Sequence, residues 1–477
     1  MTVLHKVPKG LDKKTEETLP ETNVERFNRM KKNKSFCAAP WLHIHSLPQG
    51  YIMPCCMWDY GIFKENPYRY GNMRDVKNIN EALNSDQFKK LRLQMMAGEK
   101  IKGCIRCYDR EVHAPPSGKE AEQYSMRGWF NEYFFRRSHE YHDMADYVMG
   151  TQPDGTIHDI KIRYLDIRFG NICNLRCRMC GHGLSSTWYD EEKKINPHRG
   201  LQKFIHTDCY DKIEEYLPHV TEIYFAGGEP FLYPEHLKML DKLIEVGNTN
   251  CSIKYNTNLT TLKYKKRSLL DVWKRFPNVH IGASIDGMGD TVEYIRTNMN
   301  WKDFKNNFQR VKEECPHVSI TASPTIGVFN IETYPEFDRF QIENGWTNGH
   351  HAINYIMAPD EMNIYFMPTW YKDKLIKIYE EHRDWIYNTI GVANKHALRI
   401  NEIIKRLQIE HATPEEVDKH MARLHHKLEL YDDTAGLNWK KSMPHLDAML
   451  KMHFYKRQQN LQDSELAELP KGWGEVK

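Results

Sequence analysis

The chain has 477 residues, of which 40% are hydrophobic and 27% are charged, and its formal net charge is +3. This length predicts two or three domains, and so small a net charge gives no reason to expect a nucleic-acid partner. Because no apolar run approaches the roughly 20 residues that cross a bilayer, we expect no membrane association.

Residues 1–34 are polar and rich in Lys and Glu, and we expect them to form an N-terminal tail. They lack the apolar stretch of a signal peptide, so a cytoplasmic location is expected. In that reducing compartment clustered cysteines favour metal binding over disulfides, which makes the spacing of the 11 cysteines informative.

A first set of cysteines lies in residues 35–115, around a predicted β-hairpin that turns at Gly50 and a predicted helix over 79–96. The candidate ligands are Cys37, Cys55, Cys104 and Cys107. Four thiolates are enough to close an iron–sulfur cluster completely, and they suit a structural zinc ion equally well. Cys56 is an alternative to Cys55, because neighbours on a strand point to opposite faces.

Residues 116–158 are predicted to be a helical linker, with its helix over 121–149, and strands then alternate with helices. The predicted strands are 164–169, 222–226, 251–255, 279–285, 318–326 and 352–357, and the predicted helices are 234–246, 268–275, 301–314 and 334–342. This alternation indicates an α/β domain with a parallel sheet. Right-handed crossovers curl such a sheet towards a barrel or partial barrel.

The most informative feature of the chain is a cysteine triplet directly after the first of these strands. Cys173, Cys177 and Cys180 have the spacing C-x3-C-x2-C. Three thiolates on one loop can hold three irons of a cubane cluster and leave the fourth iron without a protein ligand, and an open metal site implies chemistry there. The alternative is a zinc knuckle that lacks one ligand, or a set of buried structural cysteines.

Further polar or glycine-rich signals follow the next three strands. They are Gly227-Gly228-Glu229-Pro230, Asn256-Thr257-Asn258 and the pair Ser284 and Asp286. In parallel sheets and barrels, ligands bind at the edge formed by these strand ends. The glycines allow the backbone to approach a ligand closely, although a tight strand-to-helix turn uses glycine in the same way.

On the cysteine triplet and Gly-Gly-Glu-Pro, the chain resembles the radical SAM superfamily. The resemblance implies a partial (β/α)6 barrel over residues 159–360, a [4Fe–4S] cluster on the triplet, and S-adenosylmethionine (SAM) on the open iron. The residues that it implies for cofactor binding are Gly227, Gly228, Glu229, Pro230, Asn256, Ser284, Asp286 and Arg296. Met179 stands where this superfamily most often has an aromatic residue, and Met can fill the same apolar role.

The first cysteine set resembles the SPASM/twitch auxiliary-cluster module, which here precedes the barrel, as in the group of radical SAM proteins with an N-terminal twitch domain. The resemblance implies a small α+β domain over 35–115 with a second [4Fe–4S] cluster on Cys37, Cys55, Cys104 and Cys107. Residues 361–477 carry three predicted helices, over 371–387, 397–411 and 414–430. We expect them to form a helical extension that packs on, or covers, the barrel.

These resemblances imply a radical SAM enzyme, expected to be an oxidoreductase. Such an enzyme cleaves SAM reductively to a 5′-deoxyadenosyl radical that abstracts hydrogen from a substrate, and it takes electrons from a donor such as flavodoxin or ferredoxin. We expect oxidative modification of a peptide or protein. The alternative substrate is a small molecule, such as a sugar, a nucleotide or a cofactor precursor. A zinc-binding scaffold is the non-enzyme alternative, and no residue is assigned as catalytic proton donor or acceptor.

Overall fold

The computed structural model of the protein describes residues 21–59, 70–112, 125–136, 141–198, 200–201, 210–347, 353–392, 395–409 and 411–459. The first 20 residues of the predicted tail, the start of the predicted linker and the first residue of the sixth predicted strand lie outside these ranges. In the part of the chain that the structure describes, no helix is both long and apolar enough to cross a bilayer.

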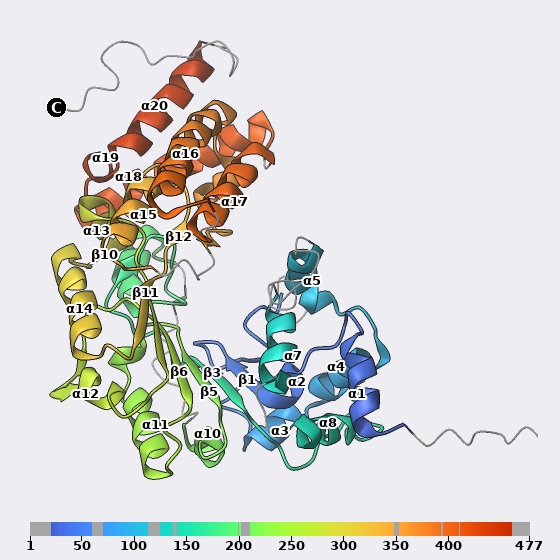
Figure 1. The fold of residues 1–477 in the computed structure, drawn as a ribbon. Helices are drawn as coiled ribbons and strands as arrows, with labels where there is room; N and C mark the ends of the chain where they lie inside the picture. Colours follow the sequence, from blue (N-terminus) through green and yellow to red (C-terminus); the bar gives the residue numbers. More distant parts are fainter. Residues whose placement is uncertain are drawn as a thin grey trace, which may run out of the picture.

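A seven-stranded sheet forms the centre of the molecule (Figure 1). In spatial order its strands are β11 (Ser319–Ala322), β9 (Val279–Ala283), β6 (Ser252–Thr257), β5 (Glu222–Phe225), β3 (Tyr164–Ile167), β1 (His43–Ser46) and β2 (Ile52–Met53). The first six run parallel, and β2 pairs antiparallel with β1 in the predicted hairpin. The predicted α/β class with a parallel core sheet is therefore confirmed.

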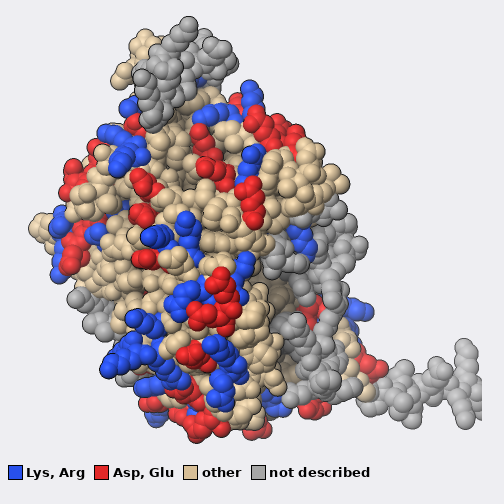
Figure 2. Space-filling model, turned by 60° about the vertical axis from the view of Figure 1, so that its left-hand side comes forward, with Lys and Arg blue, Asp and Glu red and all other residues tan. Residues whose placement is uncertain are grey.

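One face of this sheet is apolar and covered by helices α11 (Pro234–Glu245), α12 (Leu269–Trp273) and α14 (Trp301–Glu314). Tyr255 of β6 lies on this face, with its hydroxyl 2.8 Å from Nε2 of His236 in α11 and 3.3 Å from Nε1 of Trp273 in α12. Figure 2 shows the outer surface on this side, where Lys and Arg are interspersed with Asp and Glu, as expected for a solvated surface. The opposite face of the sheet is left for polar residues.

The fifth predicted strand is interrupted, which changes how the barrel continues. β11 ends at Ala322, and the chain resumes as β12 (Thr325–Ile326), which pairs in parallel with the sixth strand β13 (Asn354–Tyr355). Pro324 lies between the two segments, and it lacks the N–H that a continuous ladder needs. The sixth strand therefore pairs with β12 in a separate small sheet, next to helix α15 (Tyr334–Glu343).

The N-terminal part differs from the prediction in three places. Helix α1 (Asn23–Lys31) lies inside the predicted tail, where Thr22 and Glu25 form a capping box. The helix expected over 79–96 is divided into α3 (Ile79–Leu83) and α4 (Asp86–Ala97), because the chain at Ser85 is extended. The linker contains two helices, α7 (Met126–Arg136) and α8 (Tyr141–Met149), in place of one. The remaining elements are α2 (Ala39–Leu42), η2 (Lys102–Cys104) and α5 (Ile105–Val112).

The extension is helical, as expected, and lies beyond α13 (Gly289–Ile295) at the top of Figure 1. Its helices are α16 (Thr369–Ile390), α17 (Lys395–Ile409), α18 (Pro414–Ala435), α19 (Trp439–Ser442) and α20 (Pro444–Gln458), preceded by η6 (Asp360–Met362) and η7 (Ile364–Phe366). Helix α18 starts with a capping box between Thr413 and Glu416. Because α18 packs against α9 (Tyr189–Ile195) and α19 against α13, the extension covers the back of the cysteine triplet.

Candidate functional site

The cysteine triplet lies on the loop between β3 and the turn η3 (Ser186–Trp188) that starts α9. Part of this loop is a short strand, β4 (Arg176–Cys177), which pairs antiparallel with β10 (Arg296–Thr297) and sets Cys177 opposite Arg296. Trp188 donates its indole N–H to the carbonyl of Cys177 at 3.2 Å. Backbone pairing and a buried side chain thus fix the middle thiol of the triplet.

The three thiols act on one another electrostatically. The pKa of Cys177 is lowered, mainly because the Cys180 thiol donates a hydrogen bond to its sulfur, and the cation of Arg296 adds to this effect. Burial raises the pKa of Cys173 to about 12. Asn258 and Arg296 each have a side-chain nitrogen 3.8 Å from a sulfur, that of Cys173 and that of Cys177 respectively. Since metal ligation needs thiolates, metal uptake at this loop must release protons.

The donor set of the triplet loop has the chemistry that iron–sulfur ligation needs. Among the described residues, no group of three or more His, Cys, Asp or Glu side chains is arranged to hold a metal ion. Three soft thiolates on one loop, with a cation and an amide beside their sulfurs, therefore suit an iron–sulfur cluster.

The two glycines of Gly-Gly-Glu-Pro make close contacts within the chain. Both have positive φ angles, +78° at Gly227 and +56° at Gly228. A Cβ at Gly228 would lie 2.4 Å from the carbonyl oxygen of Ile172, and one at Gly227 would lie 2.6 Å from the side chain of Arg168. Glu229 also donates its backbone N–H to Ile172 at 2.8 Å. The turn therefore packs directly against the backbone that leads into Cys173.

Both carboxylate oxygens of Glu229 are hydrogen-bonded within the protein. Glu229 is 1% exposed, and its two carboxylate oxygens accept hydrogen bonds from the Thr257 hydroxyl and the Asn258 backbone N–H, both at 2.7 Å. A third bond comes from the backbone N–H of Phe231 at 3.2 Å. Glu229 thus ties the turn after β5 to the end of β6. Pro230 starts the following η5 turn (Pro230–Leu232) and is buried.

We predict that this carboxyl makes stability depend on pH near neutrality. Burial raises the pKa of Glu229 to about 7, against the effect of its hydrogen bonds. Because the pKa is higher in the folded protein, the protonated carboxyl contributes on the order of 3 kcal/mol to the free energy of unfolding. This contribution is complete below the ordinary pKa near 4.5 and is lost as the pH rises through 7. The thermal midpoint of the protein should fall from pH 5 to pH 8, and Glu229→Gln should lack this part of the fall. An equal slope in both proteins would contradict the assignment.

The four other residues predicted for cofactor binding divide into two pairs. Asp286 and Arg296 form a buried ion pair of 2.7 Å, and Asp286 also accepts the backbone N–H of Thr325 at 2.8 Å. Their side chains therefore pair with each other, and Arg296 also contacts the sulfur of Cys177. Asn256 is exposed and Ser284 is half-buried on the polar side of the sheet. Only this second pair keeps side chains that face solvent.

The cysteines of the first set also lie near one another, although they span 70 residues of the chain, from Cys37 to Cys107. Burial raises the pKa of the Cys55 thiol well above the ordinary value, and Cys56, Cys107, Cys104 and Cys37 raise it further. Burial also raises the pKa of Cys56 to about 12, where the main charges are those of Asp166 and Arg168, followed by Cys107. The two thiols lie after the end of β2, with Cys56 in a turn, and Cys37 and Cys104 are among the main charges on Cys55.

We predict that Cys55→Ala removes the auxiliary cluster and Cys56→Ala does not. The first variant should hold about four irons per chain after anaerobic reconstitution, and the second about eight, by the stoichiometry of two cubanes. Each variant is the matched control of the other, since the two positions are adjacent and similarly exposed. The reverse result would show that Cys56 is the ligand.

The hairpin of the first cysteine set docks beside the strand that leads to the triplet. Strand β1 pairs with β3, and the hairpin turn reaches the triplet loop, where the Gln49 amide donates to the carbonyl of Gly183 at 3.3 Å. Arg168 lies at this junction. Its Nη1 donates to Asp166 at 2.8 Å and lies 2.7 Å from Nδ1 of His45 in β1. Burial alone would raise the pKa of Asp166, but Arg168 and His45 lower it to about 2.

A polar wall, formed by Arg168, Tyr224, Lys254 and Asn256, runs along the face of the sheet opposite α11, α12 and α14, where the centre of the Trp129 ring of α7 lies 4.9 Å from the Lys254 ammonium. Lys254 is paired with Glu222 at 2.8 Å. In the described part of the chain, Nε and Nη2 of Arg168 have no hydrogen-bond partner. The first three wall residues were missed in the sequence, although polar residues at every second position of the predicted strands are a signal for such a wall. Asn258 lies in a polar run that the sequence singled out, but it was not assigned to the site.

Two regions of the chain match models of known families. Residues 167–340 match the model of the Radical SAM superfamily, and residues 37–108 match the model of SPASM, an iron–sulfur cluster-binding domain. The first region contains the cysteine triplet and Gly-Gly-Glu-Pro, and the second contains the first cysteine set. The second match favours iron–sulfur over zinc at that set. No curated protein matches the chain.

Proposed function

Because residues 167–340 match the Radical SAM superfamily and residues 37–108, which precede them, match SPASM, we propose that the chain is a radical SAM oxidoreductase that modifies a peptide or protein. Cys173, Cys177 and Cys180 hold the cluster that binds SAM, and Cys37, Cys55, Cys104 and Cys107 hold the auxiliary cluster. When bound, these groups supply a 5′-deoxyadenosyl radical and a second redox centre. The chain's own residues position them and bind the substrate.

The observation that carries this proposal is the docking of the SPASM domain on the core beside the polar space along β3, β5 and β6. Cys56 of the SPASM domain and Arg168 of the core act on each other there. The aliphatic part of Arg168 lies against Gly227, and its Asp166 partner sits in β3. A substrate in this space lies between the SPASM domain and the core strand that leads to the triplet, which suits hydrogen abstraction followed by loss of a second electron and a proton.

The polar wall supports a substrate rich in hydrogen-bonding groups. Tyr224 and Lys254 are half-buried and Asn256 is exposed, so their polar ends are accessible. Arg168 is held by Asp166 and His45 through one nitrogen, and the remainder of its guanidinium is free to receive a carbonyl or carboxylate oxygen. Peptide backbone and acidic side chains offer such oxygens at regular intervals.

The test is an anaerobic reaction with dithionite, SAM and peptides encoded next to this gene, analysed by mass spectrometry. We expect SAM-dependent loss of a pair of hydrogens from a peptide, with 5′-deoxyadenosine formed in equal amount. One hydrogen atom leaves with the deoxyadenosyl group, and an electron and a proton leave to an acceptor. Modification of a sugar, nucleotide or cofactor precursor instead would favour the small-molecule alternative. A donor such as flavodoxin or ferredoxin and a cytoplasmic location remain parts of the proposal.

A further inference from the structure

Arg178 lies between two ligands of the triplet, and its side chain points away from them into the protein interior. The side chain is 0% exposed. Its Nη1 donates to Glu191 of α9 at 2.8 Å, while Nε and Nη2 have no hydrogen-bond partner in the described part of the chain. A buried cation with one acid partner and two unsatisfied nitrogens needs further compensation.

Three aromatic rings supply that compensation. The guanidinium carbon lies 4.6 Å from the ring centre of Tyr431 and 5.4 Å from those of Trp188 and Tyr294. Cation–π attraction is strongest where water is excluded, as it is here. Tyr431 is the nearest ring, it is 5% exposed, and it comes from α18 of the extension, more than 250 residues along the chain.

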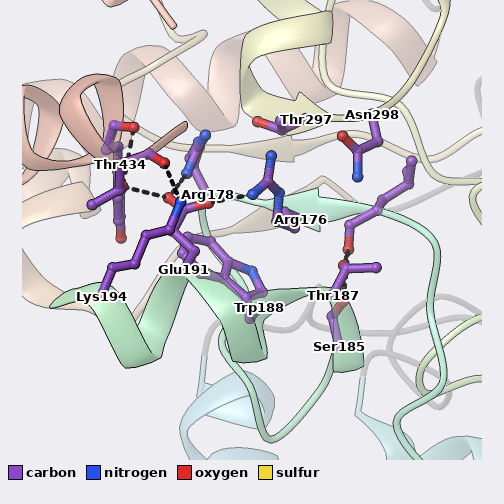
Figure 3. Close-up of polar contacts among 12 residues, drawn as sticks. Arg176, Arg178, Ser185, Thr187, Trp188, Glu191, Lys194, Thr297, Asn298 and Thr434 are labelled. Atoms are coloured by element: carbon purple, nitrogen blue, oxygen red, sulfur yellow. Dashed lines mark hydrogen bonds and ion pairs between the residues drawn. The ribbon is translucent and has the colours of Figure 1, made fainter. Parts of the chain in front are cut away.

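The extension reaches the same group by a second route (Figure 3). The Thr434 hydroxyl lies 3.3 Å from a carboxylate oxygen of Glu191 and 2.8 Å from the carbonyl oxygen of Leu430, and Lys194 of α9 donates to the carbonyl of Thr434 at 3.2 Å. Glu191 also pairs with Arg176, the residue before Cys177, at 2.9 Å. The side chains of Arg176 and Arg178, which flank Cys177, therefore both pair with Glu191, and Thr434 of α18 contacts this carboxylate.

We propose that the C-terminal extension is a clamp on the triplet loop, in which Tyr431 and Thr434 act through Arg178 and Glu191 as positioning residues for Cys177 and Cys180. The backbone supports the same conclusion. Arg178 donates its N–H to Ile295 at 2.8 Å and Cys180 donates to Cys177 at 2.9 Å, so a shift of Arg178 moves both ligands. This assigns a role to a part of the chain beyond residue 340, where the radical SAM match ends.

Hydrogen exchange of the loop in the cluster-free protein tests this proposal without SAM or substrate. Tyr431→Leu keeps an apolar side chain but removes the aromatic ring, and we expect the peptide over 174–182 to exchange about tenfold faster or more. Tyr431→Phe keeps the ring and should change the rate by less than about threefold. After reconstitution, Tyr431→Leu should also alter the electron paramagnetic resonance spectrum of the reduced triplet cluster, and Tyr431→Phe should not.

Tyr379→Leu is the matched control, since Tyr379 is fully buried in α16 of the extension and its hydroxyl donates to Ile331. It should lower thermal stability without faster exchange over 174–182. Unchanged loop exchange in Tyr431→Leu, or an equal increase in Tyr379→Leu, would overturn the clamp. If Tyr431→Leu does not fold, Thr434→Val removes the contact with Glu191 together with the hydroxyl's bonds to carbonyls of its own helix, and we then expect a two- to tenfold increase. No increase in that variant overturns the proposal as well.

Discussion

Replacing Cys173, Cys177 and Cys180 together by alanine is expected to abolish SAM cleavage under dithionite. The three thiols are the proposed ligands of the reactive cluster, and no second triplet of this spacing exists in the sequence. Iron content should fall from about eight to about four atoms per chain, because the auxiliary cluster stays. Iron and sulfide analysis, with chromatography of 5′-deoxyadenosine, measures both results.

The matched control for this triple variant is the pair Cys251→Ala and Cys315→Ala. Both thiols are buried, at 2% and 0% exposure, and neither belongs to a cysteine set. This control should keep about eight irons per chain and its SAM cleavage. Retained cleavage in the triple variant refutes the assignment of the reactive cluster, and zinc in place of iron in the unmodified protein refutes the enzyme function as a whole.

Gly228→Ala is expected to disable the site although it adds only one methyl group. The new Cβ would lie 2.4 Å from the carbonyl oxygen of Ile172, directly before Cys173, and it meets backbone that cannot rotate away. Left-handed strain and overpacking together should cost about 2–5 kcal/mol. We expect lower iron content, weaker SAM binding and a lower thermal midpoint, measured by iron analysis, calorimetry and circular dichroism.

Gly247→Ala separates these two costs. Gly247 also has a positive φ, +75°, but nothing lies within 4 Å of a Cβ there. It should show only the strain of about 1–2 kcal/mol, with normal iron content. Similar iron loss in both variants would mean that the effect is general instability and not displacement of the triplet loop.

Much of the fold could be predicted because the signals are local. Helices such as α11 and α14 follow from apolar residues at helical spacing, and the hairpin follows from a glycine turn between two short strands. The break of the fifth strand at Pro324 was also readable, since proline cannot donate to a ladder. The helix within the predicted tail has a capping signal at Thr22 and Glu25 that the polar composition obscured.

The candidate site was predicted less evenly, because residue type does not reveal the partner. Glu229, Asp286 and Arg296 are polar residues at strand ends, as a cofactor site needs, yet the Glu229 carboxylate binds the end of β6, and Asp286 and Arg296 pair with each other. Arg168 was passed over, although it lies where the SPASM domain meets the core. In a sequence, an arginine that forms a buried ion pair cannot be distinguished from an arginine that is available to a substrate.

By itself, the sequence determined the class of chemistry that we propose for this protein. The spacing of seven cysteines and the order of strands and helices are properties of short segments, and they predict two cluster sites and a parallel α/β core. Only the tertiary structure decided how these parts meet. The pairing of β1 with β3 joins the SPASM domain to the sheet, and Tyr431 reaches Arg178 across the fold. Such contacts depend on burial and charge compensation between distant segments, which no local pattern encodes.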